Sequence, residues 1–189
     1  MMNKDMKKSI LEYLRDIIYL LVVMLLVFLV FFRVVVVSGG SMNQTLYNGD
    51  VLLLLNGDLC RDYNQGDIVV ASKASFNDGE PIIKRVIATE GQMVDIDFFS
   101  GVVYVDGKPL DEPYTNTPTN VEEGMYFPLT VSEGCIFVMG DNRNYSTDSR
   151  NPDIGLIDTR EIVGKVLLLV FPGRDSFGRL QLNRIGGVS

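Results

Sequence analysis

The 189-residue chain contains no histidine. A protease of the Ser-His-Asp type needs an imidazole as its general base, so the sequence excludes that arrangement. A serine/lysine pair remains open, because a lysine held neutral can accept the proton of a serine hydroxyl. If a serine of this chain is a nucleophile, its base is therefore expected to be a lysine.

Cysteine is almost as scarce, with only Cys60 and Cys135 present. A structural zinc site normally needs four Cys or His ligands, so the chain cannot supply one. A serine/lysine pair implies no metal or cofactor, because desolvation of the lysine would activate it. A disulfide depends on how close the two thiols lie in the fold, which a sequence does not give. Two separate thiols are the simpler interpretation.

Basic side chains are in the minority, at 17 Lys and Arg against 24 Asp and Glu. Residues 1–33 carry five basic and three acidic side chains, 5 − 3 = +2, and residues 38–189 carry the rest, 12 − 21 = −9. Nucleic acid binding depends on clustered Lys and Arg. We therefore expect no nucleic acid partner.

The one long apolar run, residues 17–37, lies near the N-terminus and is interrupted only by Arg33. At about 1.5 Å per residue it would span roughly 30 Å, the thickness of a hydrocarbon core. It is longer than the apolar part of a cleavable signal peptide, about 7–15 residues. We predict an uncleaved transmembrane anchor, with Arg33 reaching the far interface. The β-branched residues Val34–Val37 favour an emerging strand.

Three lysines precede the anchor, Lys4, Lys7 and Lys8. Positive charge next to a membrane segment predicts an N-terminus inside the cell and a C-terminal domain outside it. The result would be a single-pass protein of the cell membrane, with the lipid bilayer as a partner. The expected parts are a cytoplasmic N-terminus at 1–16, the anchor at 17–37, an extracytoplasmic domain at 38–172 and a weakly patterned tail at 173–189.

Beyond the anchor, short β-rich runs alternate with turn residues, and no long helix is expected. Asp106-Gly107 signals a type I′ hairpin, and residues 112–128, with three prolines, indicate a surface excursion. The predicted fold class is mainly β and antiparallel, behind one N-terminal transmembrane helix. The expected strands are Val51–Leu55, Ile68–Ala71, Ile82–Ala88, Met93–Phe98, Val102–Val105, Ile136–Met139 and Ile162–Phe171.

Ser41, in Gly39-Gly40-Ser41-Met42 directly after the apolar segment, is the candidate nucleophile. In isolation such a stretch is ordinarily a flexible turn. The glycines also allow unusual dihedral angles and close backbone approach, which suits a loop whose N–H groups face an oxyanion. Met42 would supply a flexible apolar wall to a pocket of small-residue size.

Lys84 is the candidate base, because apolar residues lie on both sides of it in 81–87. A lysine pKa is ordinarily near ~10.4, and burial among apolar groups lowers it by up to several units. Most lysines on strands are instead solvated. A third stretch, residues 140–150, is rich in hydrogen-bonding side chains. It is either a plain polar loop or the source of a hydroxyl that orients the lysine and of acids that pair with Arg85 or Arg150.

Together the three stretches resemble the type I signal peptidases, in the compact form with a single anchor. The family motif Ser-Met-x-Pro-Thr-Leu with a later Gly-Asp is matched by 41–50, Lys-Arg-Val-Ile by 84–87, and Gly-Asp-Asn-Arg-x-x-Ser-x-Asp-Ser-Arg by 140–150. Glu112-Pro113-Tyr114 also looks like part of the family's connecting hairpin. Two positions depart from the pattern: Gln44 replaces the proline, and Glu90-Gly91-Gln92 replaces a Pro-Gly-Asp turn.

The resemblance implies that Ser41 attacks the scissile carbonyl, that its N–H serves the oxyanion hole, and that Lys84 is the general base. The Ser146 hydroxyl would orient the Lys84 amine. The implied scaffold residues are Arg85, Asp141, Asp148 and Arg150. The candidate pocket walls are Val37, Met42, Leu46 and Ile83.

The implied fold is the signal peptidase fold, and the implied activity is that of a membrane-bound serine endopeptidase without a cofactor. It would remove N-terminal signal peptides from exported preproteins at Ala-x-Ala-like sites, with the substrate added as a strand to a sheet edge. One alternative is a non-catalytic or dedicated relative that handles a pilin-like exported partner. A self-cleaving serine/lysine regulator is a further alternative, against which the anchor and the missing DNA-binding domain argue.

Overall fold

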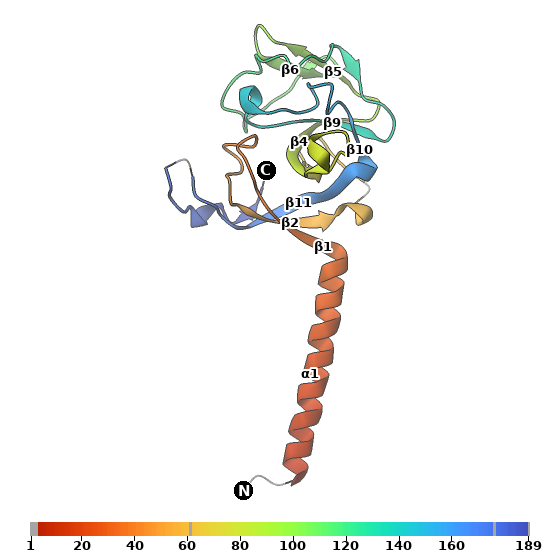
Figure 1. Cartoon of the computed structure of the whole chain (residues 1–189), viewed down its shortest axis with the longest axis vertical. Coiled ribbons are helices and arrows are strands. Elements are labelled where there is room, and N and C mark those ends of the chain that lie inside the picture. The colour runs from red at the N-terminus through yellow and green to blue at the C-terminus, as the bar shows by residue number, and fades with distance from the viewer. Residues whose placement is uncertain (1–3, 61, 176, 189) are drawn as a thin grey trace. The chain divides into compact units, whose positions relative to one another are not determined.

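The computed structural model describes residues 4–60, 62–175 and 177–188. By its contacts the chain divides into two units, Met1–Phe32 and Arg33–Ser189. The first unit consists mainly of one helix, and the β-strands that the structure describes follow it, from Phe32 onward (Figure 1).

Helix α1 covers Lys4–Phe31, and its 23-residue stretch Ser9–Phe31 is long and apolar enough to cross a membrane. The helix begins well before the expected start at residue 17 and ends before residue 37. Strand β1 (Phe32–Val36) takes over the end of the apolar run, because consecutive valines are crowded in a helix and fit an extended chain. Arg33 therefore lies on a strand, where it pairs with Asp58 at 3.3 Å.

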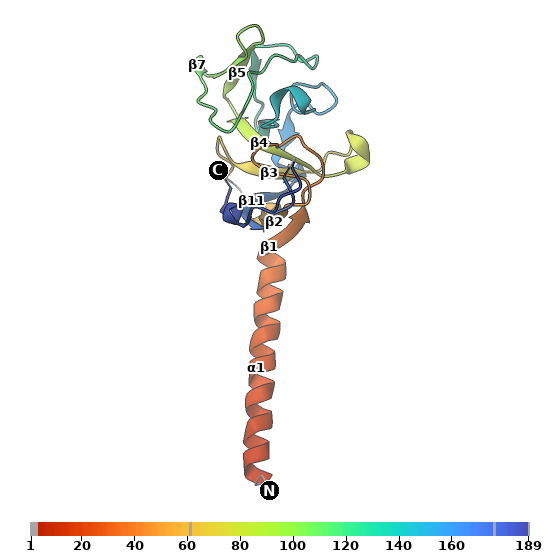
Figure 2. The same ribbon diagram turned by 90° about the vertical axis from the view of Figure 1, so that its left-hand side faces the viewer.

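The larger sheet has the order β1-β2-β11-β3-β4-β9-β10, and β12 pairs with β11. The smaller sheet has the order β7-β6-β5-β8. Within the unit Arg33–Ser189, β4 lies between the smaller sheet and the strands β2 and β11 in both views (Figures 1 and 2). The further strands are β2 (Val51–Asn56), β3 (Ile68–Ala71), β4 (Ile82–Thr89), β5 (Met93–Asp97), β6 (Val102–Val105), β7 (Lys108–Pro109), β8 (Leu129–Thr130), β9 (Cys135–Met139), β10 (Ile157–Asp158), β11 (Ile162–Phe171) and β12 (Gly186–Gly187).

The mainly antiparallel β class is confirmed, and each expected strand forms within about two residues of its predicted ends. The hairpin at Asp106-Gly107 is confirmed too: both residues have positive φ, 52° and 74°, as a type I′ turn requires. It joins β6 to β7 with Val105 opposite Lys108. Beyond residue 32 the helical elements in the described part of the chain are all short 3₁₀ turns: η1 (Gly57–Leu59), η2 (Asn77–Gly79), η3 (Arg143–Tyr145), η4 (Thr159–Glu161) and η5 (Leu182–Arg184).

The loop after β1 is packed into the core. Val37, Met42 and Leu46 are buried in one cluster with Leu52 and Leu54 of strand β2. A second cluster fills the space between the smaller sheet and strands β4 and β9. Apolar anchoring on both flanks of Ser41 therefore fixes the loop to the sheet beneath it.

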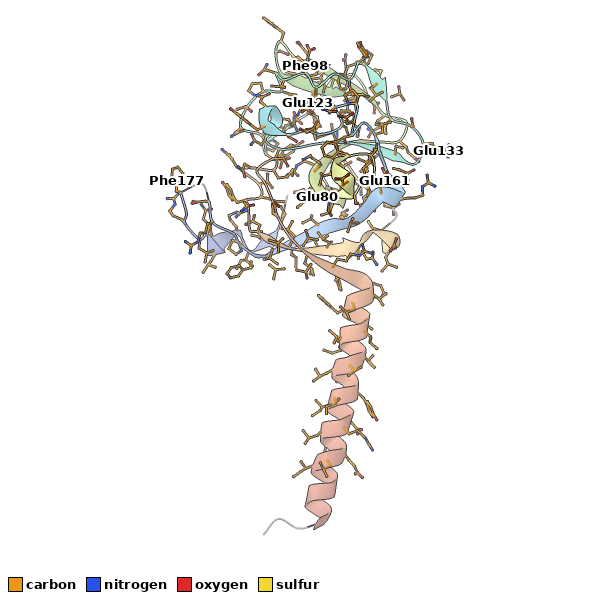
Figure 3. All side chains as sticks on the ribbon, viewed as in Figure 1. Glu80, Phe98, Glu123, Glu133, Glu161 and Phe177 are labelled. Carbon is orange, nitrogen blue, oxygen red and sulfur yellow. The ribbon has the colours of Figure 1, made fainter. Side chains whose placement is uncertain are left out.

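Two segments expected to be peripheral are tied to the domain. Residues 112–128 contain no strand, but Thr119 among them is buried. The tail 173–189 was expected to have weak order, yet β12 pairs with β11 in the register Leu168 opposite Gly187. A local pattern does not reveal a partner strand about 20 residues away in sequence. The outer part of the tail remains open to solvent, with Phe177 exposed at the tip of its turn (Figure 3).

The two cysteines are free thiols, and both are half-buried. The turn that departs from the family pattern is well formed. Gly91 has a φ of 79°, the Glu90 carboxylate accepts a hydrogen bond from Gly134 N–H at 2.8 Å, and the Gln92 side chain accepts one from Thr89 N–H at 2.9 Å. The substitution at 90–92 has therefore not disturbed the end of β4.

Candidate active site

Ser41 lies on a loop that is closed at its base. Val37 N–H donates to the Asp50 carbonyl at 2.8 Å, and Gly49 N–H donates to the Val37 carbonyl at 2.9 Å. Gly39 has a φ of 90°, in the left-handed region that favours glycine, and its N–H donates to the Asn48 side chain at 3.1 Å. The peptide bond between Asn43 and Gln44 is cis. The nucleophile candidate thus sits on a short closed loop.

Strand β4 brings Lys84 to this loop. Its neighbours Ile83 and Arg85 are buried, and the Lys84 side chain itself is only 4% exposed. The Lys84 Nζ donates a hydrogen bond to the Ser41 Oγ at 2.8 Å. Two residues separated by 43 positions in sequence are therefore in direct contact, at the distance that proton transfer between a nucleophile and its base requires.

Burial lowers the pKa of Lys84 below its ordinary value, because the charged ammonium is stripped of water. The carboxylates of Asp148, Glu123 and Asp141 act in the opposite direction, and Arg150 lowers the pKa further. No carboxylate in the described residues forms an ion pair with Lys84. Desolvation therefore dominates, and the amine becomes neutral at a lower pH than an ordinary lysine.

The chain directly after β9 connects the serine loop to the lysine strand. Asn142 N–H donates to the Ser41 carbonyl, and its side-chain amide donates to the Gly40 carbonyl, both at 3.0 Å. Asp141 is fully buried and accepts two hydrogen bonds from Arg85 of β4, at 2.8 and 2.7 Å. One short segment thus holds the backbone on both sides of the reacting pair.

Asp141 has a third contact, with the hydroxyl of Thr45 on the serine loop. Asp148 and Arg150, also fully buried, pair through the guanidinium at 2.8 and 2.9 Å. Asp148 further accepts a hydrogen bond from Gly140 N–H at 2.9 Å. All four expected scaffold residues therefore lie in two buried ion pairs that fix the loop 140–150 and the strand β4.

Ser146 is close to the pair, but the expected hydrogen bond to Lys84 is absent. The Ser146 Oγ is buried and has no hydrogen-bond partner among the described residues, and the lysine amine donates to Ser41. A Cβ built on Gly140 would lie 2.2 Å from the Ser146 Oγ and 2.5 Å from the Ser41 carbonyl oxygen. The Gly140 backbone therefore packs against both Ser146 and the Ser41 carbonyl, with no room for a side chain.

A groove of about 470 Å³ opens beside the reacting pair, lined by 35–39, by Met42 and by 80–83. Three of the four expected pocket residues, Val37, Met42 and Ile83, line it. Leu46 lies elsewhere: it is fully buried in the core and lines a different cavity, because the chain turns inward after Ser41.

One edge of β4 faces this groove. The pairing of β4 with β9 begins at Arg85, so the edge of Ile82–Lys84 on that side is left without a strand neighbour in the sheet. Within the described residues, no group of three or more His, Cys, Asp and Glu side chains is arranged to hold a metal ion.

Comparison with known proteins identifies the family. The model of the family "Signal peptidase, peptidase S26" matches residues 10–171. The chain belongs to this signal peptidase family. The resemblance expected from the three motifs is confirmed, and this member of the family is a peptidase.

Curated relatives match this signal peptidase over most of their length. Signal peptidase I S of Bacillus subtilis is 34% identical over 179 residues, which cover 90% of this chain and 94% of the relative. Signal peptidase IB of Staphylococcus aureus is 32% identical over 183 residues, covering 88% and 92%. A crystal structure of a signal peptidase I from Enterococcus faecalis is 28% identical and covers 57% of this chain and 97% of its own, with a TM-score of 0.45.

Sequence reasoning missed several residues that build the site of this peptidase. Arg143 is buried and pairs with Glu112 at 2.5 and 2.7 Å, and the ring of Tyr114 lies 3.9 Å from the Arg85 guanidinium, a cation–π contact. Burial raises the pKa of Tyr114 to about 12, so it stays neutral. Glu112 and Tyr114 belong to a stretch that resembles the family, so the sequence marked them. Only the fold shows that this stretch contacts Arg85 and Arg143.

Proposed function

We propose that this signal peptidase removes N-terminal signal peptides from exported preproteins with Ser41 as nucleophile and Lys84 as general base. The observation that carries the proposal is the 2.8 Å contact between the Lys84 Nζ and the Ser41 Oγ in a site that lowers the lysine pKa. With no histidine in the chain, no imidazole competes for the role of base.

In the reactive state the Lys84 amine is neutral and accepts the hydroxyl proton of Ser41 as the Oγ attacks the scissile carbonyl carbon. The oxyanion that forms would be bound by the Ser41 N–H. Collapse of the tetrahedral intermediate breaks the C–N bond, and the Lys84 ammonium returns its proton to the leaving amine. The same amine then deprotonates a water that attacks the acyl carbon, the bond between that carbon and the Ser41 Oγ breaks, and the Lys84 ammonium returns its proton to the Oγ.

We assign Ser146 to the orientation of the Lys84 amine. Its buried hydroxyl has no hydrogen-bond partner in the part of the chain that the structure describes, and an unpaired hydroxyl is costly to bury. A small turn of the lysine amine toward Ser146 during acylation would pair it. The buried ion pairs of Arg85 with Asp141 and of Arg150 with Asp148 act as scaffold.

For the substrate, we propose an extended preprotein segment added along the open edge of Ile82–Lys84. Val37, Met42 and Ile83 give the groove apolar walls beside Ser41, which suits small side chains such as those of an Ala-x-Ala site. Leu46 acts from behind the loop, as part of the core under Met42.

We further propose that α1 anchors the peptidase in the cell membrane as a single span. Its stretch Ser9–Phe31 has the length and composition for this, and Lys4, Lys7 and Lys8 favour a cytoplasmic N-terminus and a catalytic domain on the outer side. That orientation places the active site on the side where exported preproteins emerge.

The test is cleavage of a model preprotein with an Ala-x-Ala site, in detergent, by the wild type and by Ser41→Ala and Lys84→Ala. Both variants are expected to lose activity, Lys84→Ala by roughly 10²–10⁴-fold or more, the usual share of a general base. Lys108→Ala, an exposed lysine on the β6–β7 hairpin, is the control and is expected to cleave like the wild type.

The wild-type rate followed against pH provides the second readout. Because only the neutral amine accepts the proton, the rate is expected to rise through the lowered Lys84 pKa, below the ordinary lysine range. Equal cleavage by wild type and both variants would refute the mechanism. Absence of cleavage by the wild type on several preproteins would instead favour a dedicated or non-catalytic relative.

A further inference from the structure

Arg184, in the tail that the motifs leave out, reaches the loop that carries the nucleophile. Its guanidinium pairs with the Asp50 carboxylate through both terminal nitrogens, at 3.0 and 2.6 Å. The Asp50 side chain is fully buried and that of Arg184 is 15% exposed. A bidentate pair in this environment is shielded from solvent, so it fixes distance and direction between its partners.

The Asp50 carboxylate also links the serine loop to the start of the tail. It accepts a hydrogen bond from Tyr47 N–H at 2.8 Å and another from Gly173 N–H, at the start of the tail, at 2.6 Å. Four donors therefore converge on one carboxylate, and Arg184 supplies the only positive charge among them. Without that charge, the Asp50 carboxylate would be buried at the base of the loop with no positive group to balance it.

Arg184 makes two further contacts with the loop itself. One terminal nitrogen donates to the Thr45 carbonyl at 2.9 Å, and the guanidinium lies 4.6 Å from the centre of the Tyr47 ring. The Thr45 hydroxyl, on the other side of the same residue, bonds Asp141. Thr45 is thus held from both directions, by the tail and by the buried ion pair next to Lys84.

The turn between Thr45 and the nucleophile is short and hydrogen-bonded. Leu46 N–H donates to the Met42 carbonyl at 2.8 Å, so Thr45 lies inside a closed turn whose first residue, Met42, adjoins Ser41. A cavity of about 450 Å³ is lined by both this turn and the tail. The lining of that cavity includes Gln44, Thr45, Leu46, Asn183, Arg184 and Val188.

We propose that Arg184 is a positioning residue for catalysis: the tail 182–188 acts as a latch that holds Ser41 at the distance from Lys84 needed for proton transfer. The latch is anchored at its far end by the pairing of β12 with β11 and by Val188, which packs on the core. This inference rests on the proposed function, because it assigns Arg184 a part in the same Ser41–Lys84 reaction.

The test compares kcat and KM for preprotein cleavage by the full-length chain in detergent. Arg184→Lys keeps a positive charge beside Asp50, but a single ammonium cannot span both carboxylate oxygens and the Thr45 carbonyl. We expect kcat to fall about tenfold or more, because a small misplacement of reacting groups has a large effect on rate, while KM stays within about twofold.

A second variant separates positioning from stability. In the double variant Asp50→Asn/Arg184→Gln both charges are removed, so no unpaired charge remains buried. We expect it to fold and to show the same loss of kcat as the single lysine variant, or a larger one. The midpoint of the pH–rate limb is expected to stay at the wild-type value in both, because Arg184 contacts the serine loop and not the lysine.

The matched control is Arg179→Gln, which removes the same charge from the same tail. Arg179 pairs with Asp175 at 3.1 Å and lies over the Phe177 ring, at the outer turn of the tail. Its kcat and KM are expected to equal those of the wild type. Ser41→Ala is measured alongside and is expected to be inactive.

Each outcome decides the proposal. Wild-type kcat in the folded Arg184 variants, with only a lower unfolding temperature, would overturn the latch and leave Arg184 a structural residue. An equal loss of kcat in Arg179→Gln would also overturn it, because kcat would then depend on the positive charge of the tail and not on the contacts of Arg184. If the wild type is inactive or Ser41→Ala is active, the proposed function fails first and the latch fails with it.

Discussion

Gly140 offers the sharpest test of how closely the two serines must approach the lysine. A Cβ on Gly140 would lie 2.2 Å from the Ser146 Oγ, 2.5 Å from the Ser146 Cβ and 2.5 Å from the Ser41 carbonyl oxygen. Ordinary contact begins at 3.4 Å, so these atoms would have to move by 3.4 − 2.2 = 1.2 Å or 3.4 − 2.5 = 0.9 Å. Gly140 does not have a positive φ, so Gly140→Ala acts through this clash alone.

Rotation of the Ser146 hydroxyl does not relieve the clash, because the Ser146 Cβ and the Ser41 carbonyl remain too close. The added methyl group therefore forces the backbone at Ser41 or at Ser146 to shift from its position beside Gly140. Overpacking of a buried site costs about 1–3 kcal/mol of stability. A displacement of about 1 Å at the reacting atoms lowers kcat by roughly 10²-fold, equivalent to about 2.7 kcal/mol in the activation free energy.

The assay is preprotein cleavage with kcat and KM determined separately, at a temperature below the unfolding midpoint of the variant. Lys108→Ala is the control, because Lys108 is exposed on the β6–β7 hairpin, outside the serine loop, the lysine strand and the tail. We expect Gly140→Ala to fold, to bind preprotein and to cleave it about a hundredfold more slowly than either the wild type or the control. A folded Gly140→Ala with kcat within about threefold of the wild type would refute the packing argument.

Three further predictions concern buried polar groups. Ser146→Ala is expected to unfold at the wild-type temperature or slightly above it, since it removes an unpaired hydroxyl, while kcat falls about tenfold or more; an unchanged kcat would contradict the orienting role. Burial raises the pKa of Glu123 from 4.5 to about 7, so its contribution to stability is complete below pH 4.5 and is lost as the pH rises to about 7. Thermal unfolding of Glu123→Gln should therefore depend less on pH in that window, and an unchanged dependence would assign it to another group. Asp141→Asn leaves the Arg85 charge buried without its carboxylate and is expected to lower the free energy of unfolding by about 3–5 kcal/mol in denaturant titrations, whereas Arg160→Gln, at an exposed pair, should stay close to wild type.

The chemistry of the site could be read from the sequence to a large extent. The absence of histidine left lysine as the base, and the apolar residues around Lys84 indicated that its side chain would be buried, as it is at 4% exposure. The strands followed from β-branched runs between turn residues, and the Asp106-Gly107 hairpin from two residues that tolerate positive φ. These are local properties, and local sequence is enough to predict them.

Less could be predicted where the contacts join residues that are distant along the chain. Leu46 was expected in the pocket and is in the core, because the turn after Ser41 points it inward. Asn142, which fixes the Ser41 carbonyl, stands in a recognised motif, but nothing in that motif indicates its partner.

The residue types, and therefore the kind of reaction, were set by the sequence alone: a serine beside glycines, a lysine among apolar residues and no imidazole. Tertiary structure alone decided that Ser41 and Lys84 touch at 2.8 Å, that the lysine pKa is lowered, and that the tail returns through Arg184 to hold the serine loop. The physical reason is that desolvation and hydrogen-bond geometry depend on the side chains that surround a group in space. Most of those neighbours lie tens of residues away along the chain.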